Sequence, residues 1–143
     1  MTTVDDTPIK ELLARLAPAI QADRCTLFVV DHEKKEVWSR FAQGLEIPMI
    51  HLPLSRGVVG YVARTGRSVT LRDAYNDPRF DRSVDQQTGY RTKSILCMAV
   101  RDSESRVIGV LQALNKAEGT FSTEDEATMQ GYCAEAAPLL PAP

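Results

Sequence analysis

Apolar residues recur at helical spacing close to the N-terminus of the chain. Thr7-Pro8 offers an N-cap followed by proline at the first helical position, which suits the start of a helix. The apolar residues that follow lie three and four positions apart: Ile9, Leu12, Leu13 and Leu16. This pattern predicts a helix that Pro18 kinks or ends, because proline lacks the backbone donor that a helix interior requires.

A second helical pattern occupies the C-terminal part of the chain. Ser122 and Thr123 precede Asp125 and Glu126 with capping-box spacing, and Thr123 to Glu126 is the better match. The apolar face expected for this helix comprises Met129, Tyr132, Cys133 and Ala136. The prolines at positions 138, 141 and 143 predict that the helix ends soon afterwards.

Two β-hairpins are expected between these helices. Residues 25–30 are apolar and 36–41 alternate between charged and apolar side chains, with a polar turn between the two runs. The alternation places Val37, Ser39 and Phe41 on one face of the second strand, and Trp38 and Arg40 on the other. Residues 95–100 and 106–114 flank another polar turn and predict the second hairpin.

The middle of the chain is less regular. Residues 47–54 carry two prolines and predict an irregular, partly extended connection. A short helix is expected over 58–64, followed by a short strand over 68–71. The polar stretch 72–94 is too long for a simple connection in a compact domain, and such stretches are usually functional or disordered.

This order of elements predicts an α+β fold with a central antiparallel sheet, because hairpins dominate and no βαβ repeat is present. The terminal helices are expected on one face of the sheet, with the short helix and a long lid loop over a ligand pocket on the other. A length of 143 residues suits one domain over 1–143, with a core at about 8–137 and tails at 1–6 and 138–143.

Charge and hydropathy narrow the partners and the location. Lys and Arg number 17 against 19 Asp and Glu, so the basic excess typical of a nucleic-acid partner is missing. The longest apolar run, 95–100, is far shorter than a membrane span. The acidic N-terminus does not resemble a secretory signal, and a cytoplasmic location away from membranes is therefore expected.

Enzyme chemistry is the least favoured class. Cys25, Cys97 and Cys133 have neither CxxC spacing nor nearby histidines, which favours buried thiols over a disulfide framework or a metal site. Asp81 and Asp85 offer a carboxylate pair, but no nucleophile elbow or Cys–His pairing accompanies them. We therefore expect no catalytic residues, no metal and no enzymatic activity.

Two constellations stand out, one that clamps a strand to a helix and one that favours ligand binding. Lys116 ends the last expected strand and can reach Asp125 in the first turn of the final helix, where the helix dipole also favours a carboxylate. The alternative for this pair is an ordinary surface ion pair. Gly57-Val58-Val59-Gly60 offers free backbone N–H groups at a helix start, which suit an anion such as a cyclic phosphodiester. The alternative here is a tight turn that requires glycine.

Asn115-Lys116, Phe121 and Asp125-Glu126 match the signature of the cyclic-nucleotide-binding GAF domains of phosphodiesterases and bacterial adenylyl cyclases. The resemblance extends over about residues 8–137. The segments that carry it are Arg24-Cys25-Thr26-Leu27-Phe28, Gly57-Val58-Val59-Gly60, Asp73-Ala74-Tyr75, Asp77-Pro78-Arg79-Phe80, Val84-Asp85, Thr88-Gly89-Tyr90-Arg91-Thr92 and Ile95-Leu96-Cys97.

The resemblance implies a ligand site and a structural latch. The implied ligand-binding residues are Phe41, Ala42, Val58, Val59, Asp81, Asp85, Thr88, Thr92 and Gln112. The latch comprises Asn115, Lys116, Phe121, Asp125 and Glu126. Phe41 would stack on the base, with a purely structural place in the core as the alternative.

The chain departs from guanine-selective relatives at three of these positions. Ala42 and Gln112 stand where those proteins carry acidic residues, and Asp81 replaces an aromatic residue. The resemblance thus implies a regulatory sensor that binds a cyclic nucleotide, cAMP or cGMP with cAMP favoured, without a further cofactor, and forms a homodimer through its terminal helices. The alternatives are a GAF sensor or dimerisation module with another ligand or none, and a free-methionine-sulfoxide reductase, whose cysteine placement this chain does not share.

Overall fold

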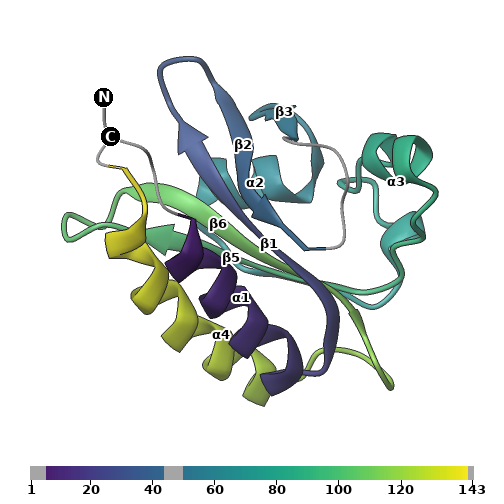
Figure 1. Cartoon of the computed structure of the whole chain (residues 1–143). Helices are drawn as coiled ribbons and strands as arrows, with labels where there is room; N and C mark the ends of the chain where they lie inside the picture. Colours follow the sequence, from purple (N-terminus) through teal and green to yellow (C-terminus); the bar gives the residue numbers. More distant parts are fainter. Residues whose placement is uncertain (1–5, 44–49, 142–143) are drawn as a thin grey trace.

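A computed structural model of the chain describes residues 6–43 and 50–141. Within these ranges the strands form one antiparallel sheet of six strands in the order β3-β2-β1-β6-β5-β4 (Figure 1). The strands are β1 (Ala22–Asp31), β2 (Glu36–Ala42), β3 (His51–Pro53), β4 (Val69–Leu71), β5 (Ile95–Arg101) and β6 (Val107–Lys116). The predicted α+β fold with an antiparallel sheet is confirmed.

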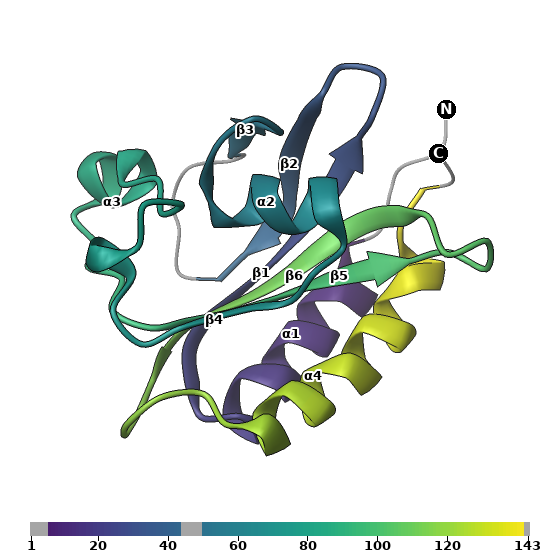
Figure 2. The same ribbon diagram turned by 180° about the vertical axis from the view of Figure 1, so that it is seen from behind.

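The helices cover both faces of this sheet, as predicted. Helices α1 (Thr7–Ala19) and α4 (Thr123–Ala136) lie side by side on one face, and α2 (Gly57–Thr65) covers the other (Figures 1 and 2). The remaining helical turns are η1 (Ala74–Asn76), α3 (Ser83–Thr88) and η2 (Ala137–Leu139). In the part of the chain that the structure describes, no helix has the length and apolarity to cross a membrane.

Strand β1 lies at the centre of the sheet and is buried on both faces. Leu27 and Val29 belong to the core beneath α1 and α4, whereas Phe28 and Val30 belong to the core beneath α2. Side chains alternate between the faces of a strand, so a strand covered on both sides has apolar residues at successive positions. This explains why residues 25–30 are almost continuously apolar in the sequence.

The starts of both terminal helices differ by one residue from the prediction. Asp6, not Thr7, is the N-cap of α1, and the helix ends at Ala19, directly after Pro18. The capping box of α4 pairs Ser122 with Asp125 instead of Thr123 with Glu126. Tertiary contacts decide this register, because the Asp125 carboxylate is buried at the helix start and Glu126 instead accepts a hydrogen bond of 2.7 Å from Thr70 Oγ1.

A β-bulge in β2 reverses the orientation predicted for Phe41. Leu27 pairs with Phe41, but Phe28 pairs with Ser39, so Arg40 is an extra residue in β2. An extra residue shifts the alternation by one position. Phe41 therefore packs on the side of α1, where Lys10 Nζ lies 5.3 Å from its ring centroid, while Val37 stays in the opposite core.

Two stretches expected to be irregular contain regular structure. Residues 72–94 hold the short helices η1 and α3, which polar sequence and low hydrophobic periodicity concealed. The connection predicted over 47–54 contains the short edge strand β3, although positions 47–49 lie outside the described residues. A strand of three residues is too short to show an alternating pattern.

The contact expected between Lys116 and Asp125 joins three elements. Lys116 Nζ at the end of β6 lies 2.8 Å from Asp125 Oδ2 in α4 and donates a hydrogen bond of 3.0 Å to the Ile20 carbonyl after α1. The Lys116 and Asp125 side chains are only 12% and 10% exposed, so this is a buried ion pair and not a surface one. Asp125 Oδ2 also accepts a hydrogen bond of 2.8 Å from the Ser122 amide.

Replacing Asp125 with Asn should lower the free energy of unfolding by about 3 kcal/mol at pH 7, because the buried Lys116 ammonium loses its counter-charge. The matched change is Glu135→Gln in the same helix as Asp125. It breaks an exposed ion pair between Glu135 and Arg15 of α1, and it should cost less than about 1 kcal/mol. Urea unfolding of both variants checks this. Equal losses would contradict a special role for the buried pair.

The same pair predicts the direction of a pH dependence. Burial raises the pKa of Asp125, but hydrogen bonds from Lys116 and Ser122 outweigh burial and hold the pKa below its ordinary value. The pair therefore stabilises the fold above the unfolded pKa of about 3.9, and this contribution is lost as the pH falls through the folded pKa. The stability difference between the natural chain and Asp125→Asn should accordingly shrink below about pH 4.

Gly60 and Gly131 predict opposite responses to alanine. A Cβ at Gly60 would lie 2.6 Å from the Leu54 carbonyl oxygen, so Gly60→Ala should destabilise the fold by about 1–2 kcal/mol through backbone displacement. A Cβ at Gly131 in α4 meets open space, and Gly131→Ala should stabilise the fold by about 0.5–1 kcal/mol through helix propensity. Thermal unfolding measures both, and an equal effect of the two changes would contradict the close approach at Gly60.

Candidate functional site

A cavity of about 700 Å³, its open mouth included, lies between the α2 side of the sheet and the segment 80–92. Its floor is formed by neighbouring strands β1 and β6, where Thr26 lies directly opposite Gln112. Arg24 and Phe28 flank Thr26 on the same face, since alternate residues of a strand point the same way. Within the described residues, neither the Thr26 hydroxyl nor the Gln112 amide has a hydrogen-bond partner, so both are available to a ligand.

One wall of the cavity is the start of helix α2. Val58 and Val59 line the cavity and are almost fully buried, and Gly57 begins the helix with a φ of +79° that favours glycine. Gly60 instead faces the Leu54 carbonyl. Of the two glycines proposed for anion capture, only Gly57 therefore borders the cavity, and Gly60 is required for close packing.

The lid, which comprises residues 72–94, is organised around the Asp85 carboxylate in α3. Asp85 Oδ2 accepts hydrogen bonds from the Tyr75 hydroxyl (2.7 Å) and the Thr92 amide (2.8 Å). Asp85 Oδ1 accepts a third, from Thr92 Oγ1, at 2.8 Å. Asp85 is 8% exposed and Thr92 is 2% exposed. The carboxylate thus joins both ends of the lid, and the hydrogen bond to Asp85 raises the pKa of Tyr75.

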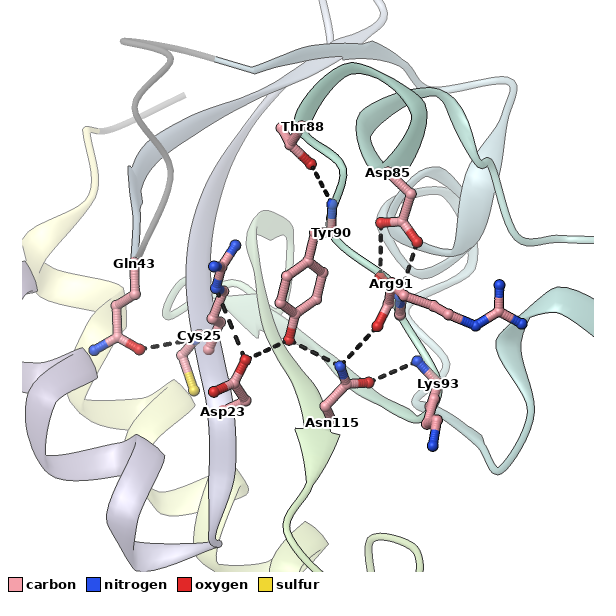
Figure 3. Close-up of polar contacts among 11 residues, drawn as sticks. Asp23, Cys25, Gln43, Asp85, Thr88, Tyr90, Arg91, Lys93 and Asn115 are labelled. Atoms are coloured by element: carbon pink, nitrogen blue, oxygen red, sulfur yellow. Dashed lines mark hydrogen bonds and ion pairs between the residues drawn. The ribbon is translucent and has the colours of Figure 1, made fainter.

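A second network fastens the lid to the end of β6 (Figure 3). The Asn115 side chain donates to the Tyr90 hydroxyl (2.9 Å) and the Arg91 carbonyl (2.9 Å), and accepts from the Lys93 amide (2.6 Å). Tyr90 in turn donates to Asp23 Oδ2 at 2.7 Å. Burial first, and then the bond to Asp23, raise the pKa of Tyr90. Asn115 has a φ of 60°, a conformation that asparagine tolerates better than most residues.

The other polar lid residues bond within the lid. Thr88 Oγ1 donates to the Val84 carbonyl at 2.8 Å, and Asp81 Oδ1 accepts from the Ser83 amide at 2.9 Å. Asp81 Oδ2 lies 3.5 Å from the Arg56 guanidinium. Hydrogen bonds between groups of the lid itself therefore stabilise its conformation.

The structure brings together most of the residues implied for the ligand site. The following border the cavity: Val58, Val59, Asp81, Asp85, Thr88, Thr92 and Gln112. Ala42 packs against the core beneath α2 but does not line the cavity. Phe41 lies on the opposite side of the sheet because of the β2 bulge, so the geometry expected for base stacking is not present.

The latch residues occupy different places. Lys116 and Asp125 form the buried ion pair, Phe121 is 4% exposed in the core beneath α1 and α4, and Glu126 accepts from Thr70. Asn115 belongs to the lid network instead. The adjacent residues Asn115 and Lys116 therefore connect the lid on one side with the terminal helices on the other.

Sequence reasoning missed four polar residues of the cavity: Arg24, Thr26, Gln43 and Tyr90. The centre of the Arg24 guanidinium lies 4.0 Å from the Tyr90 ring centroid, which places a cation at the cavity wall. Alternation along β1 gives the signal for Arg24 and Thr26, since both share a face with Phe28. No sequence pattern identifies Tyr90, because its position depends on the fold of the lid.

Thiol and metal chemistry find little support at this site. The cysteines are free and buried, and burial raises the pKa of Cys25 and of Cys133 to about 12. None of the cysteines borders the cavity. The described ranges contain no group of His, Cys, Asp and Glu side chains arranged to hold a metal ion.

Comparison with known proteins assigns the fold to a family. A family model described as "GAF domain" matches residues 6–140. The Dual 3',5'-cyclic-AMP and -GMP phosphodiesterase 11A of Takifugu rubripes is 38% identical over 135 residues, covering 85% of this chain and 15% of that protein. The chain therefore spans about 15% of the length of this relative. These matches confirm the family resemblance inferred from the sequence.

Solved structures share the architecture. The GAF domain of an Acinetobacter phosphoenolpyruvate-protein phosphotransferase has a TM-score of 0.73 at 26% identity, covering 90% of this chain and 76% of that chain. A free methionine-R-sulfoxide reductase of Neisseria meningitidis has a TM-score of 0.68 at 22% identity, covering 94% and 76%. The fold thus occurs in a domain of a phosphotransferase and in a sulfoxide reductase, and it does not by itself assign a function.

Asp85→Ala should loosen the lid and lower the free energy of unfolding by about 2 kcal/mol, because two buried donors of Thr92 and the partly buried Tyr75 hydroxyl lose their acceptor. Hydrogen exchange should show faster exchange of the Thr92 amide. Asp73→Ala is the control in the same segment, since Asp73 is exposed and its carboxylate accepts a hydrogen bond from the exposed Asn76 side chain. Unchanged Thr92 exchange in Asp85→Ala would show that the carboxylate does not organise the lid.

Proposed function

Because this chain belongs to the GAF domain family, we propose that it is a regulatory module whose cavity binds a cyclic nucleotide, cAMP in preference to cGMP. The observation that carries this proposal is a pair of polar side chains, Thr26 and Gln112, that have no hydrogen-bond partner in the described ranges and lie on the floor of a cavity bordered by Gly57 and Arg24. The 38% identity to a phosphodiesterase named for both cyclic nucleotides supports the ligand class.

The phosphate of the ligand is assigned to the wall formed by the start of α2, where Gly57 lies, and Arg24 supplies a cation elsewhere in the cavity lining. A cyclic phosphodiester carries one negative charge, which the Arg24 guanidinium and the free N–H groups at the start of α2 can balance. Asp81 lies beside Gly57, but Arg56 and the Ser83 amide already satisfy its carboxylate. The net field at this wall therefore tolerates an anion.

The base is assigned to the sheet floor. Gln112 offers both a donor and an acceptor, which match the N6 and N7 or N1 positions of adenine. Guanine presents two donors at N1 and N2 that favour a carboxylate, and Ala42 and Gln112 supply none. Asp85 and Thr92 are bonded to each other, so they shape the lid in this conformation instead of contacting the base.

The route from ligand to output follows the end of β6. Asn115 holds the returning lid, and the next residue, Lys116, contacts both the end of α1 and the start of α4. A change in the lid on ligand binding therefore acts close to both terminal helices. We propose that these helices carry the signal and form the contact between two copies of the chain.

One observation favours a second candidate, a GAF module with another ligand or none. The lid polar groups at Asp85, Thr88 and Thr92 are hydrogen-bonded to other groups of the chain. These three side chains therefore do not require a nucleotide to satisfy them in this conformation. A thiol enzyme is a weaker alternative, since the cysteines are buried away from the cavity.

Isothermal titration calorimetry with cAMP, cGMP and 5'-AMP tests the proposal. cAMP should bind more tightly than cGMP, and a concentration of 100 times the dissociation constant should stabilise the fold by about 2.7 kcal/mol. Gln112→Glu should change the cAMP to cGMP affinity ratio by about tenfold in favour of cGMP. The same change at exposed Gln130 is the control and should leave the ratio unaltered. Absence of heat and of thermal stabilisation with both cyclic nucleotides would refute the proposal.

A further inference from the structure

A second groove lies on the outer side of the lid. It measures about 1210 Å³ with its open side included, and it is distinct from the cavity already described. Four arginines from two separate segments line it: Arg56, Arg64, Arg79 and Arg82. Arg56 is the N-cap residue of α2, and Arg64 lies in the last turn of the same helix. Arg79 and Arg82 belong to the lid.

Only a thin wall separates this arginine groove from the cavity. Gly57, Phe80 and Asp81 border both spaces. Phe80 packs against the core beneath α2, with its ring 5.3 Å from the Tyr75 ring. Asp81 Oδ2 lies 3.5 Å from the guanidinium of Arg56, which belongs to the α2 side of the groove. Movement of Phe80 and Asp81 would therefore connect the groove with the cavity.

The groove carries a local excess of positive charge on a chain whose net charge is −2. Arg79 is balanced by Asp77, which it contacts through two nitrogens at 2.9 and 3.0 Å. Asp81 balances one further arginine, so two of the four arginines have no carboxylate partner among the described residues.

The remaining arginines keep donors free for a ligand. Arg64 contacts the Leu54 carbonyl through one nitrogen, and Arg82 contacts the Tyr75 carbonyl through one nitrogen at 2.9 Å. A guanidinium has five N–H donors, so each of these side chains retains several. The Arg56 side chain is 65% exposed. Such forked donors suit the oxygens of a phosphate.

We propose that the arginine groove is an anion-binding site that captures the phosphate of the cavity's ligand first and passes it inward past Phe80 and Asp81. This inference rests on the proposed function, because it assumes an anionic ligand in the cavity. A phosphate at Arg56 competes with Asp81 for the same guanidinium, and the pair is weak because Arg56 is largely exposed. Binding in the groove thus loosens the wall that closes the cavity.

Stopped-flow association of a fluorescent cAMP derivative tests this step. The double variant Arg64→Gln/Arg82→Gln should lower the association rate constant by about fivefold at low salt, since a positive groove raises the local concentration of an anion. The dissociation rate constant should stay within about twofold, because neither residue lines the cavity. The difference between the variant and the natural chain should vanish at high salt, where the field is screened.

The matched control is Arg67→Gln/Arg106→Gln, which removes the same charge outside the groove. An equal loss of association rate in both double variants would attribute the effect to net charge and overturn the proposal. Inorganic pyrophosphate is a second probe. It should slow association to the natural chain without displacing bound nucleotide, and this slowing should disappear in Arg64→Gln/Arg82→Gln.

Asp81→Asn tests the wall without removing an arginine. It should speed association, since Arg56 is released and a negative charge is lost, and an unchanged rate would overturn the gating step. Calorimetry on the natural chain separates the two levels of inference. Binding with an unaltered association rate in the arginine variants refutes the groove alone, whereas no binding of cyclic nucleotide refutes the proposed function and the groove together.

Discussion

The buried contact between Lys116 and Asp125 is the constraint on which the arrangement of elements depends. An ammonium and a carboxylate can be removed from water only if each has charged and hydrogen-bonded partners, and here Ile20 and Ser122 supply the remaining bonds. These requirements fix the end of β6 against the start of α4 and the end of α1. The apolar cores on the two faces of the sheet then pack around elements whose relative positions this contact defines.

The same end of β6 also determines the cavity. Asn115 satisfies the backbone of the returning lid, while Asp85 joins the lid's two ends, so the lid is a closed hydrogen-bonded unit and not a loose loop. Opening such a unit exposes donors and acceptors that a ligand or water must satisfy. The free polar groups of the cavity instead lie on its rigid floor, at Thr26 and Gln112. A stable floor and a separable lid are the physical requirements of a ligand sensor.

Electrostatics divide the two sides of the lid. The inner cavity is largely apolar with Arg24 near Tyr90, whereas the outer groove concentrates arginines around Asp81. On the proposed route, an anionic ligand would meet the arginines before the apolar interior. Phe80 and Asp81 border both spaces and would be the residues that such a ligand passes.

The sequence by itself determined the α+β fold, the order of the longer helices and strands and the Lys116–Asp125 contact, because periodicity and residue spacing along the chain encode them directly. Tertiary structure decided the rest. The extra residue Arg40 in β2 moved Phe41 away from the cavity, and no alternating pattern announces a bulge. Long-range hydrogen bonds gave Asp85 and Tyr90 their roles within the lid, and such partners depend on folding and not on sequence distance.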